Sequence, residues 1–120
     1  MSTQTHTTRG TAPRYGDEEL QTLQRNTFQY FWKETNPANG LIPDNTSADG
    51  IPSSIAGVGL ALSSYPVGVE RSFVSRAQAV ERTLATLRFF WNAPHGPMPE
   101  ATGHRGFFYH FLDEIGRAHV

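Results

Sequence analysis

The apolar segment at residues 53–65, SSIAGVGLALSSY, restricts the fold of this chain more than any other stretch. Its larger apolar residues recur at the three- and four-residue spacing of one helical face: Ile55, Val58, Leu62 and Tyr65. Gly57 and Gly59 lie in the interior, where each costs roughly 0.5–1 kcal/mol relative to alanine. Such a helix is not expected to be stable alone, so we predict a buried helix with other backbones packed closely against its glycines.

Two further helices are predicted on either side of this segment. The first covers residues 17–34 and opens with three acidic residues, of which Asp17 is the expected cap. The third starts at SRAQ, in which Ser75 and Gln78 match a capping box. One apolar face of the third helix is marked by Ala77, Val80, Leu84, Leu87 and Phe90 or Trp91.

The connections between these helices are rich in proline, glycine and turn-forming polar residues. Ser53 or Ser54 is expected to cap the middle helix, and Pro66 to end it. Residues 36–52 form a long loop, and a loop of that length without regular structure is usually functional or disordered. Residues 1–16 lack periodicity and are predicted to be a disordered lead.

The aromatic stretch FFYHFL at residues 107–112 favours an extended segment or a hairpin arm. No partner strand for it is visible in the sequence. Three helices joined by long loops therefore predict an all-α fold with one short extended element near its C-terminal end.

Composition and charge exclude several functions. Ten basic residues oppose eleven acidic ones, so no basic face for nucleic acid is indicated. There is no cysteine, which excludes disulfides and cysteine-based metal sites. No apolar signal region or membrane span is visible, so we expect a soluble cytoplasmic protein, or a periplasmic or secreted one if the true start lies elsewhere.

No standard catalytic motif, phosphate loop or cofactor fingerprint is present. Of the five histidines, His95, His104 and His110 have irregular spacing, so we expect no metal and no cofactor. Asp44 and Asp49 are interpreted as turn residues of the long loop.

Aromatic residues give the strongest functional signal. Most of them fall in three tight clusters and are expected to pack in the core. Tyr109 and His110, however, lie between two phenylalanines in a segment flanked by a loop. Aromatic rings stack on the apolar faces of sugars while polar side chains bind the hydroxyls, so this pair is a candidate sugar contact.

Four blocks in the same order, SIAGVGLAL, YPVGVER, SRAQ and GFFYHFLD, resemble the glucoamylase-like glycoside hydrolases. That family includes endo-β-1,2-glucanases and a domain of cyclic β-1,2-glucan synthases. The resemblance implies the first helices of an (α/α)6 barrel, a β-glucan or related substrate, and a pair of catalytic carboxylic acids beyond residue 113. It implies sugar contacts at Arg71, Tyr109 and His110, and exposed apolar faces on the second and third helices.

The last six residues, IGRAHV, match one reading frame of a widely used sequencing adapter. We therefore expect residues 114–120 to be an artefact, and residues 17–113 to be the N-terminal part of a glucoamylase-like (α/α)6 domain. This fragment of a glycoside hydrolase is expected to be inactive by itself. The alternative is a small, complete helical module that binds a partner without catalysis.

Overall fold

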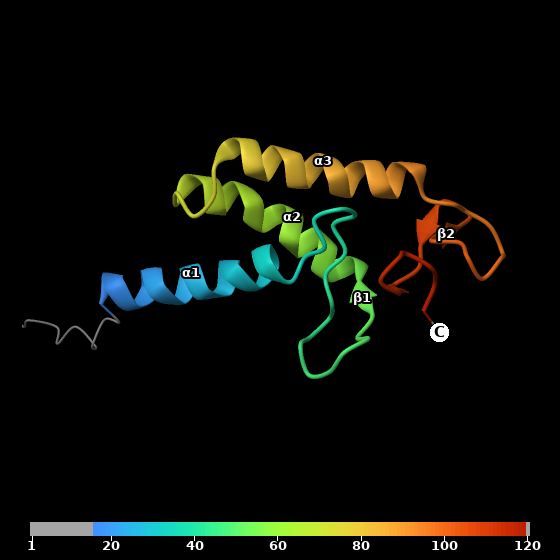
Figure 1. The fold of residues 1–120 in the computed structure, drawn as a ribbon, viewed down its shortest axis with the longest axis horizontal. Coiled ribbons are helices and arrows are strands. Elements are labelled where there is room, and N and C mark those ends of the chain that lie inside the picture. Colours follow the sequence, from blue (N-terminus) through green and yellow to red (C-terminus); the bar gives the residue numbers. More distant parts are fainter. Residues whose placement is uncertain (1–15, 120) are drawn as a thin grey trace, which may run out of the picture.

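A computed structural model describes residues 16–119, and within that range the chain is mainly helical (Figure 1). Its three helices are α1 (Asp17–Lys33), α2 (Ile55–Glu70) and α3 (Arg76–Asn92). Its short strands are β1 (Ser53–Ser54), β2 (Gly103–His104), β3 (Phe107–Phe108) and β4 (Phe111–Leu112). The predicted helical fold class is confirmed, whereas nearly all of the predicted disordered lead lies outside the described residues.

Both outer helices begin close to the predicted residues. The capping box of α3 is confirmed: Ser75 Oγ accepts from the Gln78 N–H at 3.1 Å, and Gln78 Oε1 accepts from the Ser75 N–H at 2.9 Å. In α1, the cap is Gly16 and not Asp17. Glu19 explains the difference, because its carboxylate accepts from the Gly16 N–H at 3.1 Å and fixes the start one residue earlier.

The middle helix is longer than predicted, because α2 passes through Pro66 and ends at Glu70. Proline removes one helical hydrogen bond, but packing of the last turn compensates for that loss. Tyr65 and Gly68 are both buried there against neighbouring elements. The helix ends where Ser72 takes a φ of 59°, and the Phe73 N–H then donates to the Gly68 carbonyl at 2.8 Å.

A cluster of aromatic rings joins α1 to α2 and α3. Phe28 is 3% exposed and lies with Trp32 and Phe73 at ring-centroid distances of 6.0 and 5.4 Å. Trp32 also meets the Tyr65 ring edge-on at 5.6 Å. From α3, Arg82 lies 4.1 Å over the Trp32 ring and donates to the Trp32 carbonyl at 3.0 Å. These contacts hold the C-terminal half of α1 against the α2–α3 pair.

A second cluster is built from Leu41, Ile42, Val58 and Leu112, which come from the long loop, α2 and β4. Leu112 is fully buried in it. The loop is also seated on α3, because Gly40 has a φ of 75° and leaves no room for a Cβ beside Thr86. The loop at residues 36–52 is therefore part of the folded core at its inner edge.

The aromatic stretch has strand partners, so the expectation that it lacks them was wrong. Antiparallel β1 and β4 place Ser53 opposite Leu112 and Ser54 opposite Phe111. Antiparallel β2 and β3 form a hairpin. Each strand has two residues, which is too short to give a periodic signal in the sequence.

The apolar outer faces of α2 and α3 are exposed, as predicted. The exposed apolar residues of these two helices are Leu60, Val67, Val80, Leu84, Leu87 and Trp91. The prediction of close packing at both interior glycines was wrong: Gly59 has no neighbour within 4 Å, and Gly57 makes one ordinary contact with Ile42. The close approach occurs instead at Gly68, whose Cβ would lie 2.3 Å from the Phe28 ring.

Two glycine-to-alanine changes in the same helix should therefore have opposite effects. Gly68→Ala should lower the free energy of unfolding by about 1–3 kcal/mol, because the buried Phe28 ring has no space to move away. Gly59→Ala should raise it by up to about 1 kcal/mol, because a methyl group there meets open space and favours the helix. Urea unfolding followed by far-UV circular dichroism measures both; equal effects would contradict this account of Gly68.

Candidate functional site

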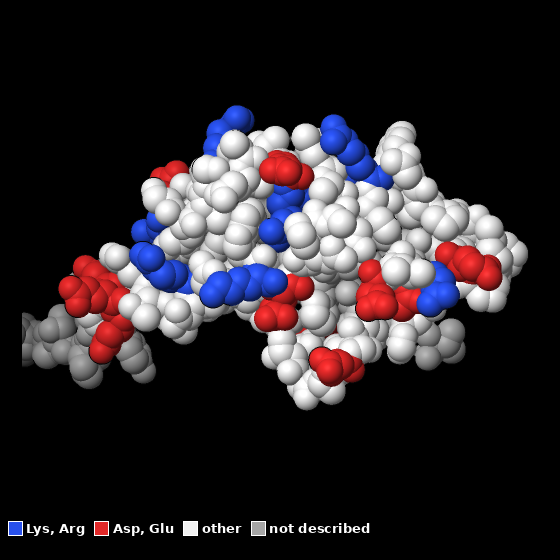
Figure 2. Space-filling view, viewed as in Figure 1, with Lys and Arg blue, Asp and Glu red and all other residues white. Residues whose placement is uncertain are grey.

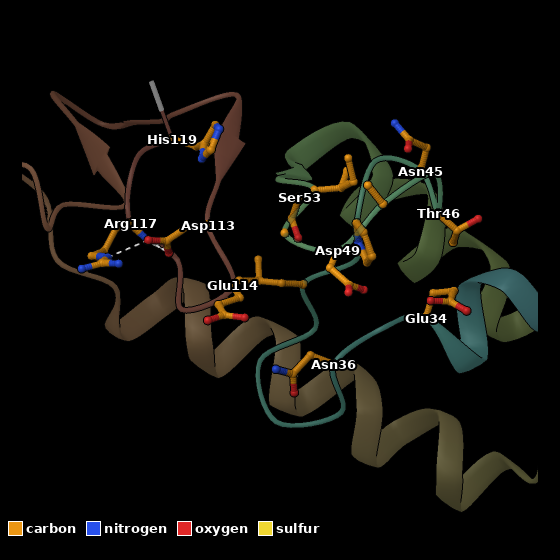
Figure 3. Close-up of a pocket in the computed structure, with 15 residues that line it drawn as sticks. Glu34, Asn36, Asn45, Thr46, Asp49, Ser53, Asp113, Glu114, Arg117 and His119 are labelled. Atoms are coloured by element: carbon orange, nitrogen blue, oxygen red, sulfur yellow. Dashed lines mark hydrogen bonds and ion pairs between the residues drawn. The ribbon is translucent and has the colours of Figure 1, made fainter.

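A polar cavity of about 780 Å³ lies between the long loop and the turn that follows β4 (Figure 3). Figure 3 shows Asn45, Thr46 and Asp49 on the loop side, with Asp113 and Arg117 across from them. The end of α1 contributes Glu34, and β1 contributes Ser53. Side-chain carboxylates, amides and hydroxyls of this kind bind the hydroxyl groups of polar ligands.

The loop wall of the cavity is held by hydrogen bonds at both sides. Tyr30 Oη of α1 donates to the Pro43 carbonyl at 2.5 Å, and the Asp44 N–H donates to the Pro52 carbonyl at 2.9 Å. Burial raises the pKa of the Tyr30 hydroxyl, and the nearby charges of Glu34 and Asp44 raise it further. Tyr30 therefore stays a neutral donor and fixes the loop to α1.

Asp113 is the one cavity carboxylate that is tightly bound to its neighbours in the described structure. Its carboxylate accepts from the Ile115 and Arg117 N–H groups at 3.1 and 2.8 Å, and it pairs with Arg117 Nε at 2.6 Å. Burial alone raises the pKa of Asp113, but these hydrogen bonds and the Arg117 charge outweigh it and hold the pKa below its ordinary value. Asp113 is therefore ionised and suited to structural or hydroxyl-binding roles.

His110 and Tyr109 do not line the cavity, and His110 contacts the start of α2 instead. The His110 carbonyl accepts from the Ile55 N–H at 3.0 Å, and its Nε2 lies 3.4 Å from Ser54 Oγ. Tyr109 is half-buried and packs on the cluster that contains Leu112. The structure thus leaves the His110 ring accessible and uses much of the Tyr109 ring for packing.

Arg71 lies apart from both of these residues. It follows the last residue of α2, whereas His110 contacts the first. A helix of 16 residues is about 24 Å long, so the two side chains do not share one sugar-binding site. Arg71 is exposed at the α2–α3 turn. Its role as a sugar contact stays a prediction, and it would apply to a surface separate from that of His110.

The sequence indicated the cavity wall only in part. The length of the loop at residues 36–52 was a functional signal, but Asp49 was interpreted as a turn residue. Nothing local predicts that Glu34 and Asp113 reach the same cavity, because they are brought together by long-range packing. Among residues 16–119, no group of side chains is arranged to hold a metal ion.

Charge and helix composition set two further limits. Acidic and basic residues alternate over the face drawn in Figure 2, with no broad patch of one sign. None of the described helices has both the length and the apolar character required to cross a bilayer.

The bonds to Asp113 predict a local effect of pH. A carboxylate with a lowered pKa stabilises the folded turn above the ordinary value of about 3.9, and this contribution is lost as pH falls through the lowered pKa. Arg117→Ala should raise the pKa of Asp113, measured by the ¹³C carboxyl shift against pH. Arg105→Ala removes a cation that does not contact Asp113 and should leave that pKa unchanged; equal shifts in both variants would contradict the assignment.

Comparison with known proteins supports a resemblance in sequence and in fold. No protein-family model matches the chain. Over 103 residues it is 26% identical to an exo β-1,2-glucooligosaccharide sophorohydrolase (non-reducing end) of Parabacteroides distasonis; the match covers 86% of this chain and 13% of that protein.

A crystal structure of a candidate glucoamylase from Bacteroides uniformis superposes with a TM-score of 0.69 at 30% identity, over 88% of this chain and 24% of that one. The chain thus spans a quarter or less of each relative. In sequence and in fold, it is similar to one part of the glucoamylase-like glycoside hydrolases.

Proposed function

We propose that this chain forms part of the substrate-binding wall of a glycoside hydrolase that acts on β-linked gluco-oligosaccharides. The cavity between the long loop and the turn after β4 is the observation that carries the proposal, because carboxylate, amide and hydroxyl side chains line it. The similarity to a sophorohydrolase of β-1,2-glucooligosaccharides supports this substrate class.

The side chains around the cavity suit hydroxyl recognition better than bond cleavage. Glycosidases use one carboxylic acid with a raised pKa to protonate the leaving oxygen, and a second carboxylate to act on water or on the sugar. Asp113 has the opposite shift, toward the ionised form. We therefore assign no catalytic residue and expect binding without hydrolysis.

The sugar contacts are proposed for residues 34–53 and 107–113. Glu34, Asp49 and His110 are the proposed hydroxyl-binding groups of this surface. Residues 114–120 receive no sugar-binding role because their sequence is adapter-like, although Glu114, Arg117 and His119 line the cavity.

A second candidate is a helical interaction module, and one observation favours it. An apolar groove of about 340 Å³ runs between α2 and α3 and is lined by Pro66, Val69, Val80 and Leu84. Large exposed apolar surfaces are typical of protein–protein contacts. A module complete in itself should unfold cooperatively as a monomer, which sedimentation and thermal unfolding can measure.

Sugar titration tests the proposed function directly. Sophorose and longer β-1,2-gluco-oligosaccharides should shift the amide NMR signals of the loop at residues 43–53 and of His110, with no release of glucose or sophorose. Asp49→Asn should weaken binding about tenfold, which corresponds to the loss of about 1.4 kcal/mol of hydrogen bonding. Glu81→Gln on α3, outside the cavity, is the matched control and should bind as the native chain does.

Three results would change the interpretation. Absence of any shift at millimolar sugar would refute the binding role. Release of sugar by the native chain would refute the expectation of inactivity. Equal loss of binding in both variants would show that the cavity is not the site.

A further inference from the structure

The β2–β3 hairpin follows α3 in the chain, and Figure 1 shows β2 beyond the C-terminal end of that helix. In its register His104 lies opposite Phe107, and Gly103 lies opposite Phe108. Side chains directly opposite each other on antiparallel strands project from the same face and lie close together. The His104 and Phe107 side chains therefore form a pair on one face of the hairpin.

The other face of the hairpin is fixed to the protein. The Phe108 ring lies 4.9 Å from the Phe90 ring of α3 and 5.2 Å from the His95 ring. Gly103 allows this close contact, because a Cβ there would lie 2.6 Å from the His95 ring. The Gly96 N–H adds a hydrogen bond to the Gly103 carbonyl at 2.9 Å. The hairpin that carries His104 and Phe107 is thus held against α3 and the loop that follows it.

The Phe107 side chain is exposed to solvent on the outer face of this hairpin. It is 79% exposed, whereas Tyr109 in the same segment is half-buried against the core. An apolar ring exposed to this extent on a well-fixed strand gains nothing from packing within the described structure. Such a ring is suited to stacking on a ligand, because the strand that carries it is fixed and an aromatic side chain has only two χ angles to order on binding.

The turn of the hairpin places a cation next to the exposed ring. Arg105 and Gly106 have φ values of 53° and 86°, as a two-residue turn of the I′ type requires. Arginine is disfavoured at positive φ, and such backbone strain is concentrated at functional positions. The ion pair found among residues 16–119 joins Asp113 to Arg117, so the Arg105 guanidinium has no carboxylate partner there.

We propose that Phe107, His104 and Arg105 form a sugar-stacking platform on the β2–β3 hairpin, outside the polar cavity. The Phe107 ring would cover the apolar face of a glucose unit, and the imidazole and guanidinium would bind its hydroxyl groups, to which both donate. None of the three residues lines the cavity. The platform is therefore an additional contact for an oligosaccharide, and this inference rests on the proposed function.

Three variants of the full chain test the platform by calorimetric or NMR titration with a β-1,2-gluco-oligosaccharide. Phe107→Ala should weaken binding about tenfold, and Phe107→Trp should retain it, because a flat ring is preserved. Arg105→Gly should weaken binding while it raises the melting temperature, since glycine accepts the positive φ without strain. A purely structural arginine would not separate binding from stability in this way.

Leu87→Ala is the matched control, because Leu87 is also an exposed apolar residue but lies on α3. It should bind sugar as the native chain does. If the native chain binds sugar and Phe107→Ala binds it equally well, the platform is wrong and the proposed function stands. If the native chain binds no sugar, both are wrong. If Phe107→Ala abolishes self-association and leaves sugar binding unchanged, the exposed ring belongs to a protein contact and the platform is wrong.

Discussion

The pairing of β1 with β4 is the long-range contact on which the wall of the polar cavity depends. It joins the start of α2 to the aromatic segment near the other end of the described chain, with Leu112 fully buried at the junction. On one side of this junction the loop at residues 36–52 closes over the polar cavity. On the other side the chain leads back to the β2–β3 hairpin that carries Phe107. Loss of this pairing would separate the Asp113 side of the cavity from α2, although the pairing consists of only two residue pairs, whereas the hairpin would stay attached to α3 through Phe108.

Two apolar clusters pack on α2: one contains Phe28, and the other contains Leu112 of β4 and so stabilises the pairing directly. Gly68 admits the Phe28 ring and so fixes α1 at the C-terminal end of α2, while Val58 supports Leu41 and Leu112 at the N-terminal end. The inner face of α2 is therefore used along its whole length. The outer faces of α2 and α3 carry exposed leucine, valine and tryptophan side chains. The solved glucoamylase structure that superposes on this chain is about four times longer than the part that it shares with it.

Local signals in the sequence predicted the parts of the fold that depend on neighbouring residues. The Ser75–Gln78 capping box was predicted correctly because both partners lie within one helical turn. The passage of α2 through Pro66 was missed because tertiary packing of Tyr65 and Gly68 outweighs the local preference of proline. The strand partners were missed for the same kind of reason, since β1 and β4 are far apart in the chain and two residues each. For the proposed sugar contacts, the sequence identified the aromatic segment at residues 107–112 but not which of its rings is exposed to solvent.

The difference between Tyr109 and Phe107 shows how a break between two short strands decides which ring of the segment is buried and which is exposed. Both are aromatic and lie two positions apart, so a strictly extended strand would place them on the same face. The chain does not stay in one strand: residues up to Phe108 pair with β2, and residues from Phe111 pair with β1. The break between β3 and β4 turns Tyr109 toward Leu112 and Val58, and leaves Phe107 on the outer face of the hairpin. A ring that packs in the core stabilises the fold, and only the ring outside it is free to stack on a sugar.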